Sequence, residues 1–254
     1  MKLESIIIIL IFLATSTCQN SEWKTENNSI RPVCVLSDNE YLKSEFQEIS
    51  ANQLDNHEFW LTMNHSDYEV AVEIENGGLK LAEPKFDKPF YELEDGKLEI
   101  INNGEFGGAL NFIPNEHPSD TIEIWNVPIN YIFNFKGEIY FVVGIAHMMD
   151  SGGAIFKLNR KGDQFTYEEV VRLDSAPEAI SVYKDMILIA SHRMFTVVEN
   201  FEKNNIVKEA FWRSLYPNSI TVKNEEEVYI GMRGGYSKLS LNSKKVKYFK
   251  YKEK

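Results

Sequence analysis

Short stretches in which apolar and polar residues alternate recur along most of the chain, from about residue 41 to the end. They are rich in β-branched and aromatic residues, and Gly, Asn, Asp or Pro residues separate them. Alternation with a period of two is typical of strands with one buried face, and the separating residues are typical of turns. No stretch beyond the N-terminal region carries a sustained helical stripe. The pattern therefore predicts an all-β fold.

Pairs of these predicted strands repeat at a nearly constant spacing. They begin at residues 58, 97, 138, 185 and 227, at intervals of 39, 41, 47 and 42 residues. A strand that starts at a proline precedes four of the five pairs, and another strand follows each pair, so each unit is expected to hold four antiparallel strands. The predicted pairs are Glu58–Met63 with Tyr68–Ile74, Lys97–Ile101 with Gly108–Ile113, Glu138–Val143 with Gly153–Leu158, Asp185–Ala190 with Met194–Val198, and Glu227–Gly231 with Tyr236–Leu241.

Four-stranded units at a period near 40 residues resemble the blades of β-propeller repeat proteins. One such sheet cannot bury both of its faces, whereas sheets packed side by side in a ring can. The resemblance covers residues 41–254 and implies a five-bladed propeller, although no Trp-Asp, Asp-box or kelch motif recurs in the units. The alternative fold is an irregular β-sandwich. Residues 1–17 and 18–40 are assigned to a signal peptide and a polar tether.

The N-terminal residues carry the features of a secretory leader. Lys2 lies in a short polar start, and Ile6–Ala14 is an apolar run of nine residues. A helix that spans a bilayer needs about 20 apolar residues, so this run is too short. Its length and the small residues that follow it match a signal peptide. We therefore expect residues 1–17 to be removed and the remaining chain to be exported.

The end of this leader allows two forms of the mature protein. Cleavage after Ala14-Thr15-Ser16 would release a freely secreted chain. Alternatively, Leu13–Cys18 resembles a bacterial lipoprotein signal, which implies lipidation of Cys18 and anchoring in the periplasm or outer membrane; Thr17 departs from the residues that such signals prefer. An unlipidated Cys18 can pair with Cys34 in an oxidising compartment.

The charge of the chain limits its partners. The 38 acidic residues outnumber the 27 basic ones, which gives a formal net charge of -11. An acidic surface repels phosphate backbones, so nucleic acid is excluded as the expected partner. The charge fits solubility, or a cationic protein partner. We expect a monomer that contacts membranes only through a lipid at Cys18.

Common catalytic and metal-binding motifs are absent from the sequence. It has no G-x-G-x-x-G, P-loop, G-x-S-x-G, H-E-x-x-H or C-x-x-C pattern, and its five histidines lack metal-ligand spacing. No catalytic residue, metal ligand or cofactor is therefore assigned.

In a propeller, the turns between the second and third strands of all units open on one face. Polar groups that converge at such a concave mouth are suited to binding. Two arginines beside several carboxylates favour a polar or charged partner. The predicted binding residues are His65, Asp67, Glu105, His147, Asp150, His192, Arg193 and Arg233.

Two functions remain open at this stage. The first is an exported binding protein for a protein or a small polar ligand, of which an immunity or inhibitor module is a special case. The second is a small secreted propeller enzyme, either a hydrolase or a glutaminyl-cyclase-like protein. A glycoside hydrolase needs two carboxylates that flank its substrate. Glu105 and Asp150 are the candidates at the mouth, although the motifs of these enzyme families do not occur.

Overall fold

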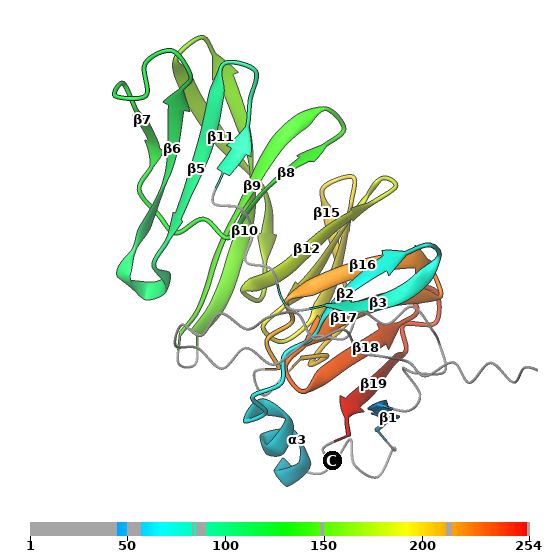
Figure 1. Cartoon of the computed structure of the whole chain (residues 1–254). Helices are drawn as coiled ribbons and strands as arrows, with labels where there is room; N and C mark the ends of the chain where they lie inside the picture. The colour runs from blue at the N-terminus through cyan, green and yellow to red at the C-terminus, as the bar shows by residue number, and fades with distance from the viewer. Residues whose placement is uncertain are drawn as a thin grey trace, which may run out of the picture.

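The computed structural model describes residues 45–49, 57–82, 84, 90–147, 150–211 and 215–252. Most of them form small antiparallel sheets, which confirms the all-β prediction (Figure 1). The described exceptions to the strands are helix α3 (His57–Asn64), a 3-10 turn η1 (Gly104–Phe106) and the connecting loops. The predicted leader, the tether, Cys18 and Cys34 lie outside the described residues.

Two four-stranded sheets are formed by consecutive strands in the first half of the described chain. In each sheet the strands follow one another in space as they do in sequence. The first sheet holds β4 (Phe90–Glu92), β5 (Gly96–Asn102), β6 (Gly108–Pro114) and β7 (Ile122–Trp125). The second holds β8 (Tyr131–Phe135), β9 (Glu138–His147), β10 (Asp150–Lys161) and β11 (Gln164–Leu173).

Two further sheets follow the same order. The third holds β12 (Pro177–Tyr183), β13 (Met186–Ser191), β14 (Phe195–Glu199) and β15 (Glu202–Val207). The fourth holds β16 (Ser219–Asn224), β17 (Glu227–Met232), β18 (Gly235–Leu239) and β19 (Val246–Tyr251), and β1 (Phe46–Glu48) pairs with the outer side of β19. The predicted strand pairs of the last four units are thus confirmed.

The first unit differs from the prediction. The segment Glu58–Met63 is not a strand but most of helix α3. Trp60 and Met63 are three positions apart, lie on one side of this helix and are both buried, and the Trp60 ring packs edge-on against Tyr248 at 5.2 Å. A six-residue run is too short to separate a period of 2 from one of 3.6, so the packing decides. Only β2 (Ala71–Glu75) and β3 (Gly78–Ala82) of this unit are strands, joined as a hairpin.

A second correction concerns the last strand of the third sheet. The prediction placed it at 206–212, but β15 begins at Glu202. Asn200 and Phe201, between β14 and β15, have φ angles of 51° and 62°. Positive φ at both central residues is typical of a two-residue type I′ turn, which starts the next strand at once. Trp212, predicted to end this strand, lies outside the described residues.

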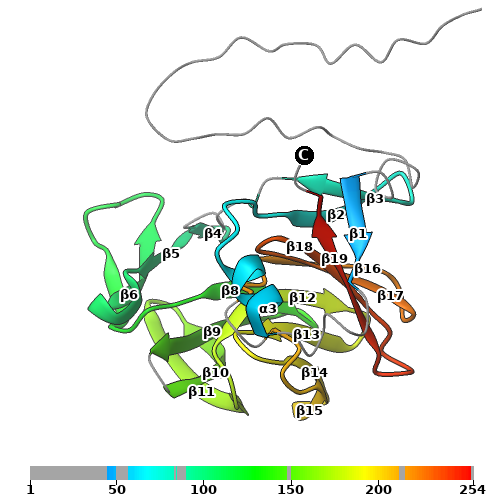
Figure 2. The same ribbon diagram turned by 90° about the horizontal axis from the view of Figure 1, so that it is seen from below.

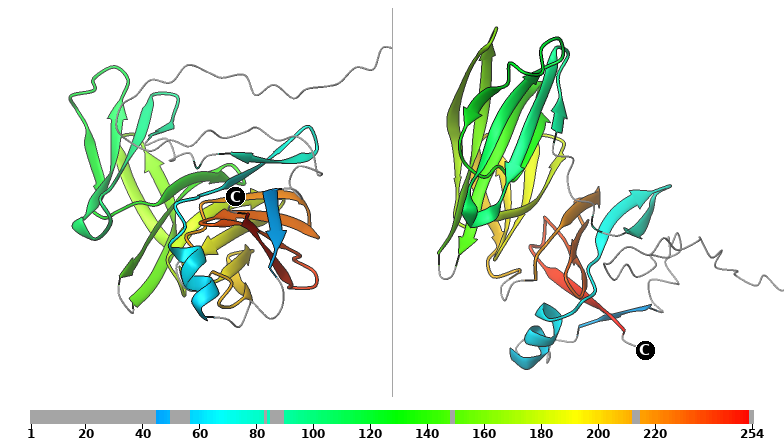
Figure 3. Two further views of the ribbon diagram at one scale, coloured as in Figure 1. Left: turned by 60° about the horizontal axis from the view of Figure 1, so that its bottom comes forward. Right: turned by 60° about the vertical axis from the view of Figure 1, so that its left-hand side comes forward.

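The sheets pack face to face in the order of the chain (Figures 1 and 3). Strand β13 shows how, because successive side chains point to opposite faces. Ile187 and Ile189 are buried against the second sheet, while Leu188 and Ala190 are buried against the fourth. Leu98 and Phe141 belong to the corresponding cluster between the first and second sheets.

The β2–β3 hairpin packs on the fourth sheet. Val72 and Leu81 are buried in a cluster with Tyr236 of β18. The N–H of Val72 also donates a 2.9 Å hydrogen bond to Oγ of Ser219 in β16. No buried cluster of the described residues joins this hairpin to the first sheet. Of the connection from β3 to β4, only Pro84 is described.

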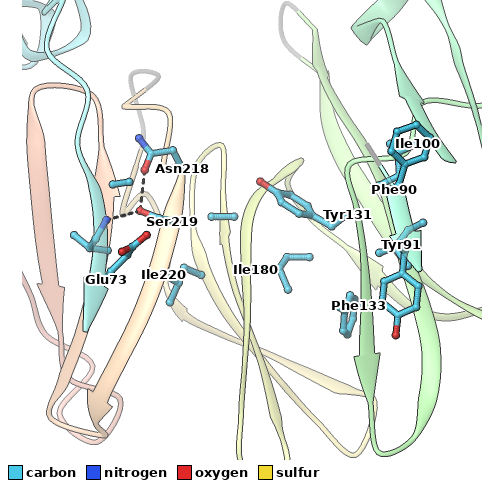
Figure 4. Close-up of a pocket in the computed structure, with 14 residues that line it drawn as sticks. Glu73, Phe90, Tyr91, Ile100, Tyr131, Phe133, Ile180, Asn218, Ser219 and Ile220 are labelled. Atoms are coloured by element: carbon cyan, nitrogen blue, oxygen red, sulfur yellow. Dashed lines mark hydrogen bonds between the residues drawn. The ribbon is translucent and has the colours of Figure 1, made fainter. Parts of the chain in front are cut away.

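The first strand of every sheet borders one central cavity. Strands β2, β4, β8, β12 and β16 all contribute to its lining, and its volume is about 470 Å³ (Figure 4). Each of the four-stranded sheets places this strand at its inner end. The sheets therefore radiate from a common axis.

Candidate functional site

A second cavity, of about 870 Å³, lies at the end of the axis from which helix α3 projects. Figure 2 looks onto this end of the molecule. We call this cavity the mouth. The loops that enter the first strands and those that follow the second strands converge here from all units. Its polar and charged lining consists of Glu69, Asn102, Glu105, Asn130, Tyr131, Glu178, His192, Tyr216, Asn218 and Arg233.

Three carboxylates of the mouth are each held by a basic side chain. Arg233 donates from Nε and Nη2 to Oε1 of Glu69, both at 3.2 Å. Nδ1 of His192 lies 3.1 Å from Oε1 of Glu178, and Nδ1 of His147 lies 2.5 Å from Oε2 of Glu105.

Each of these carboxylates uses one oxygen for its basic partner. Within the described part of the chain, the second oxygens of Glu69, Glu105 and Glu178 accept no hydrogen bond from the protein. A carboxylate can accept several hydrogen bonds, so each retains the capacity to accept one from a ligand. The residues that line the mouth include three carboxylates and one arginine, which makes it acidic when the histidines are neutral.

Arg233 is fixed on three sides. Besides its bonds to Glu69, its Nη1 donates a 3.1 Å hydrogen bond to the carbonyl oxygen of Asn64, at the end of α3. Its guanidinium carbon lies 4.2 Å from the centre of the Tyr216 ring, within the range of a cation–π contact. A guanidinium with these partners is part of the wall of the mouth rather than a free clamp for an anion.

Two buried amides of the mouth have spare hydrogen-bonding capacity. Asn218 accepts from the Ser219 hydroxyl through Oδ1, and Asn130 donates to the carbonyl oxygen of Pro177. Nδ2 of Asn218 and Oδ1 of Asn130 are buried and have no hydrogen-bond partner among the described residues. Buried polar atoms are normally paired, so a polar group bound in the mouth can complete their bonding.

The predicted binding residues fall into three groups. Glu105, His192 and Arg233 line the mouth, and His147 is joined to it through Glu105. Asp150 lines a neighbouring groove of about 680 Å³, between the first and second sheets. Three others line neither cavity: His65, Asp67 and Arg193.

The residues outside the mouth have local reasons for their positions. His65 and Asp67 are exposed and follow α3, so the predicted turn between two strands does not exist at this point. Arg193 donates to both oxygens of Glu209 at 3.0 Å, and both side chains are about half exposed. It forms a surface ion pair beside the mouth.

Sequence reasoning missed several residues of the mouth. Glu178 and Asn218 directly follow Pro177 and Pro217, and Asn130 follows Pro128 at the second position. These prolines mark the entry to the first strands, so a polar residue just after them was a usable signal. Glu69 carried no such signal, because its place depends on an isolated β-bridge to Arg233.

The mouth continues into the central cavity. Ile100, Tyr131 and Asn218 line both. Beyond them the lining becomes largely apolar, with Phe90, Tyr91, Phe133, Ile180 and Ile220 arranged around the cavity in Figure 4. These side chains are only half-buried, so part of their apolar surface faces the cavity.

The groups needed for some other chemistries are not brought together. No three His, Cys, Asp or Glu side chains of the described residues lie close enough to hold a metal ion. Within the same residues, α3 has too few residues to cross a membrane, and the search for a spanning helix finds none. Glu105 and Asp150, the two carboxylates considered for hydrolysis, both border the groove between the first and second sheets.

Comparison with known proteins assigns no family. No protein-family model matches the chain, and no curated protein matches it. Three solved structures are similar over part of it. The computationally designed Ika4 protein is 10% identical, with a TM-score of 0.37, over 64% of this chain and 89% of that one.

The other two are longer than the region that matches. The tricorn protease is 10% identical, with a TM-score of 0.39, over 68% of this chain and 19% of that one. The N-terminal domain of Nup159 is 13% identical, with a TM-score of 0.35, over 57% of this chain and 38% of that one. The chain therefore spans about a fifth and two fifths of their lengths, and likenesses at this level do not assign an activity.

Proposed function

We propose that this chain is an exported binding protein, built as a five-bladed β-propeller, whose mouth binds a positively charged group of a small ligand or a protein partner. The observation that carries the proposal is the set of three carboxylates, Glu69, Glu105 and Glu178, each with one oxygen unbonded within the described residues, around one cavity. Charge-assisted hydrogen bonds to carboxylates are among the stronger ones in proteins.

The propeller is supported by the way in which the sheets meet. Five inner strands border one cavity, and the fourth sheet packs on the hairpin of the first unit. In this arrangement the hairpin β2–β3 is a reduced first blade, and the ring closes between β3 and β4. Export is supported by the apolar run Ile6–Ala14, and Cys18 is the residue that would carry a lipid.

A cationic ligand fits the rest of the mouth as well. The ring of Tyr216 is 38% exposed and already packs against one cation, Arg233. The net charge of -11 draws cations toward the protein and raises their rate of association. A lysine or arginine side chain of a protein partner would satisfy the same groups, as expected for an inhibitor or immunity module that acts on a cationic protein.

The test is to remove the three charges and measure the binding of a cation. We expect the triple variant Glu69→Gln, Glu105→Gln, Glu178→Gln to bind arginine amide at least tenfold more weakly than the unchanged mature chain, by isothermal titration calorimetry. The matched control replaces Glu48, Glu209 and Glu225, which form exposed ion pairs with Lys247, Arg193 and Lys184. It changes the net charge by the same amount and should bind normally. Equal losses in both variants would contradict a specific site in the mouth.

A further inference from the structure

We infer that the ligand carries an apolar body behind its cationic group, and that this body occupies the central cavity between the inner strands. The inference rests on the proposed function, because it extends the same site along the axis. It assigns the ligand to the class of amphipathic amines, in which a protonated nitrogen is joined to an aromatic or branched aliphatic group.

The two cavities form one path. Tyr131 borders both, and its hydroxyl donates a hydrogen bond to the backbone carbonyl of Glu178, the residue whose carboxylate faces the mouth. Asn218 also borders both, and Ser219, to which it is bonded, lines the central cavity. A ligand held by a carboxylate of the mouth therefore points its remaining atoms past these residues toward the central cavity.

The chemistry of the lining changes along this path. Large apolar side chains of β4, β8, β12 and β16 surround the central cavity and remain half-buried. Apolar surface that is open to a concave cavity gains free energy when an apolar group covers it. Its volume of about 470 Å³ lies within the range of small-ligand sites.

Charges in the central cavity are few. Glu73 is the one charged side chain of its described lining, and Nζ of Lys80 lies 3.7 Å from its Oε2. The carboxylates of the mouth stand at one end only. This polarity gives the ligand an orientation, with the cation at the mouth and the apolar body inside.

Three small probes separate the two parts of the site. They are 3-phenylpropylamine, 3-phenylpropanoate and propylamine, titrated into the mature full-length chain by calorimetry. We expect 3-phenylpropylamine to bind at least tenfold more tightly than either of the others, because only it offers both the cation and the apolar body.

Each comparison overturns a different statement. If propylamine binds as tightly as 3-phenylpropylamine, the inference about the central cavity is wrong, while the cationic mouth stands. If 3-phenylpropanoate binds as tightly as the amine, the cationic mouth is wrong, while the apolar site stands. If none of the three binds at millimolar concentration, both are overturned.

A cavity-filling variant locates the apolar body. Ile180→Phe adds an aromatic ring to the lining of the central cavity and should reduce the affinity for 3-phenylpropylamine to that for propylamine. Val182→Phe is the matched control, because Val182 is two positions further along β12, is 41% exposed and does not line the cavity. It should leave the preference for 3-phenylpropylamine intact. An unchanged preference in Ile180→Phe would overturn the placement.

Discussion

The guanidinium of Arg233 donates two hydrogen bonds to one carboxylate oxygen of Glu69, a residue that precedes it by 164 positions in the chain. The same guanidinium bonds to the end of α3 at Asn64 and lies over the ring of Tyr216. One side chain thus holds together the segment before β2, the helix and the loop that enters β16. These contacts attach the N-terminal unit to the C-terminal sheet.

Because of these contacts, Arg233→Ala should lower the free energy of unfolding by about 1–3 kcal/mol, the range for partly buried charged hydrogen bonds together with a cation–π contact. Arg193→Ala is the control, since its pair with Glu209 is half exposed and such pairs contribute about 0–1 kcal/mol. Urea unfolding monitored by tryptophan fluorescence measures both. Equal effects of the two substitutions would show that Arg233 does not join the units.

Much of the fold could be predicted because its signals are local. Strands β5, β9, β13 and β17 begin within one residue of the predicted positions. Their hairpins are marked by turn residues nearby, such as Lys136-Gly137 with positive φ at both positions. Helix α3 could not be predicted, because the burial of Trp60 depends on Tyr248, far away in the sequence.

The site shows the same division. Glu105, His192 and Arg233 were found because they occupy equivalent turns of the repeat, and the structure brings them to one cavity. His65 and Asp67 were placed by assuming four strands in the first unit, which has two. Glu69 and the apolar lining of the central cavity depend on how distant units meet, which the pattern of a single unit does not contain.

Gly231 tests the contact between the first and last units. A Cβ atom at this position would lie 2.2 Å from the carbonyl oxygen of Val70 and 2.5 Å from Oγ of Ser219. The backbone before β2 would therefore have to move away from β17. We expect Gly231→Ala to lower the free energy of unfolding by about 2–4 kcal/mol, as overpacking and a lost hydrogen bond do.

Gly152→Ala is the matched control for this substitution. Gly152 is also a strand glycine, and a Cβ there would have its nearest neighbour at 3.9 Å, the carbonyl oxygen of Leu173. It should change stability by less than about 1 kcal/mol. Thermal unfolding of both variants provides the comparison, and a Gly231→Ala protein as stable as the control would contradict the packing of β17 against the first unit.

Export of the chain predicts the loss of its leader. Mass spectrometry of the protein isolated from its own cells should find the N-terminus at or near Thr17 or Cys18 instead of Met1. If Cys18 is lipidated, Cys18→Ser should move the protein from the membrane fraction to the soluble one, whereas Cys34→Ser should not. A Met1 terminus on cytoplasmic protein would refute the export.

Glu227 gives the stability a dependence on pH at the end of the molecule opposite the mouth. Nζ of Lys238 lies 2.6 Å and Nζ of Lys223 lies 3.1 Å from its carboxylate oxygens, and these lysines lower the pKa of Glu227 to about 2. The unfolded chain has the ordinary pKa, near 4.5. The ionised carboxylate therefore stabilises the fold fully above pH 4.5, and this contribution is lost as the pH falls from about 4.5 to 2.

Replacing this carboxylate should make the loss visible as a difference between two proteins. At pH 7, Glu227→Gln should unfold with about 1–2 kcal/mol less free energy than the unchanged chain, a value reduced from the full pKa shift because the pair is partly exposed to solvent. The gap should narrow below pH 4.5, because the unchanged chain then loses the same interaction. Glu48→Gln, which breaks the exposed pair with Lys247, is the control and should cost about 0–1 kcal/mol. Urea unfolding at several pH values measures all three proteins, and a gap that stays constant down to pH 3 would mean that the lysines do not stabilise the ionised form of Glu227.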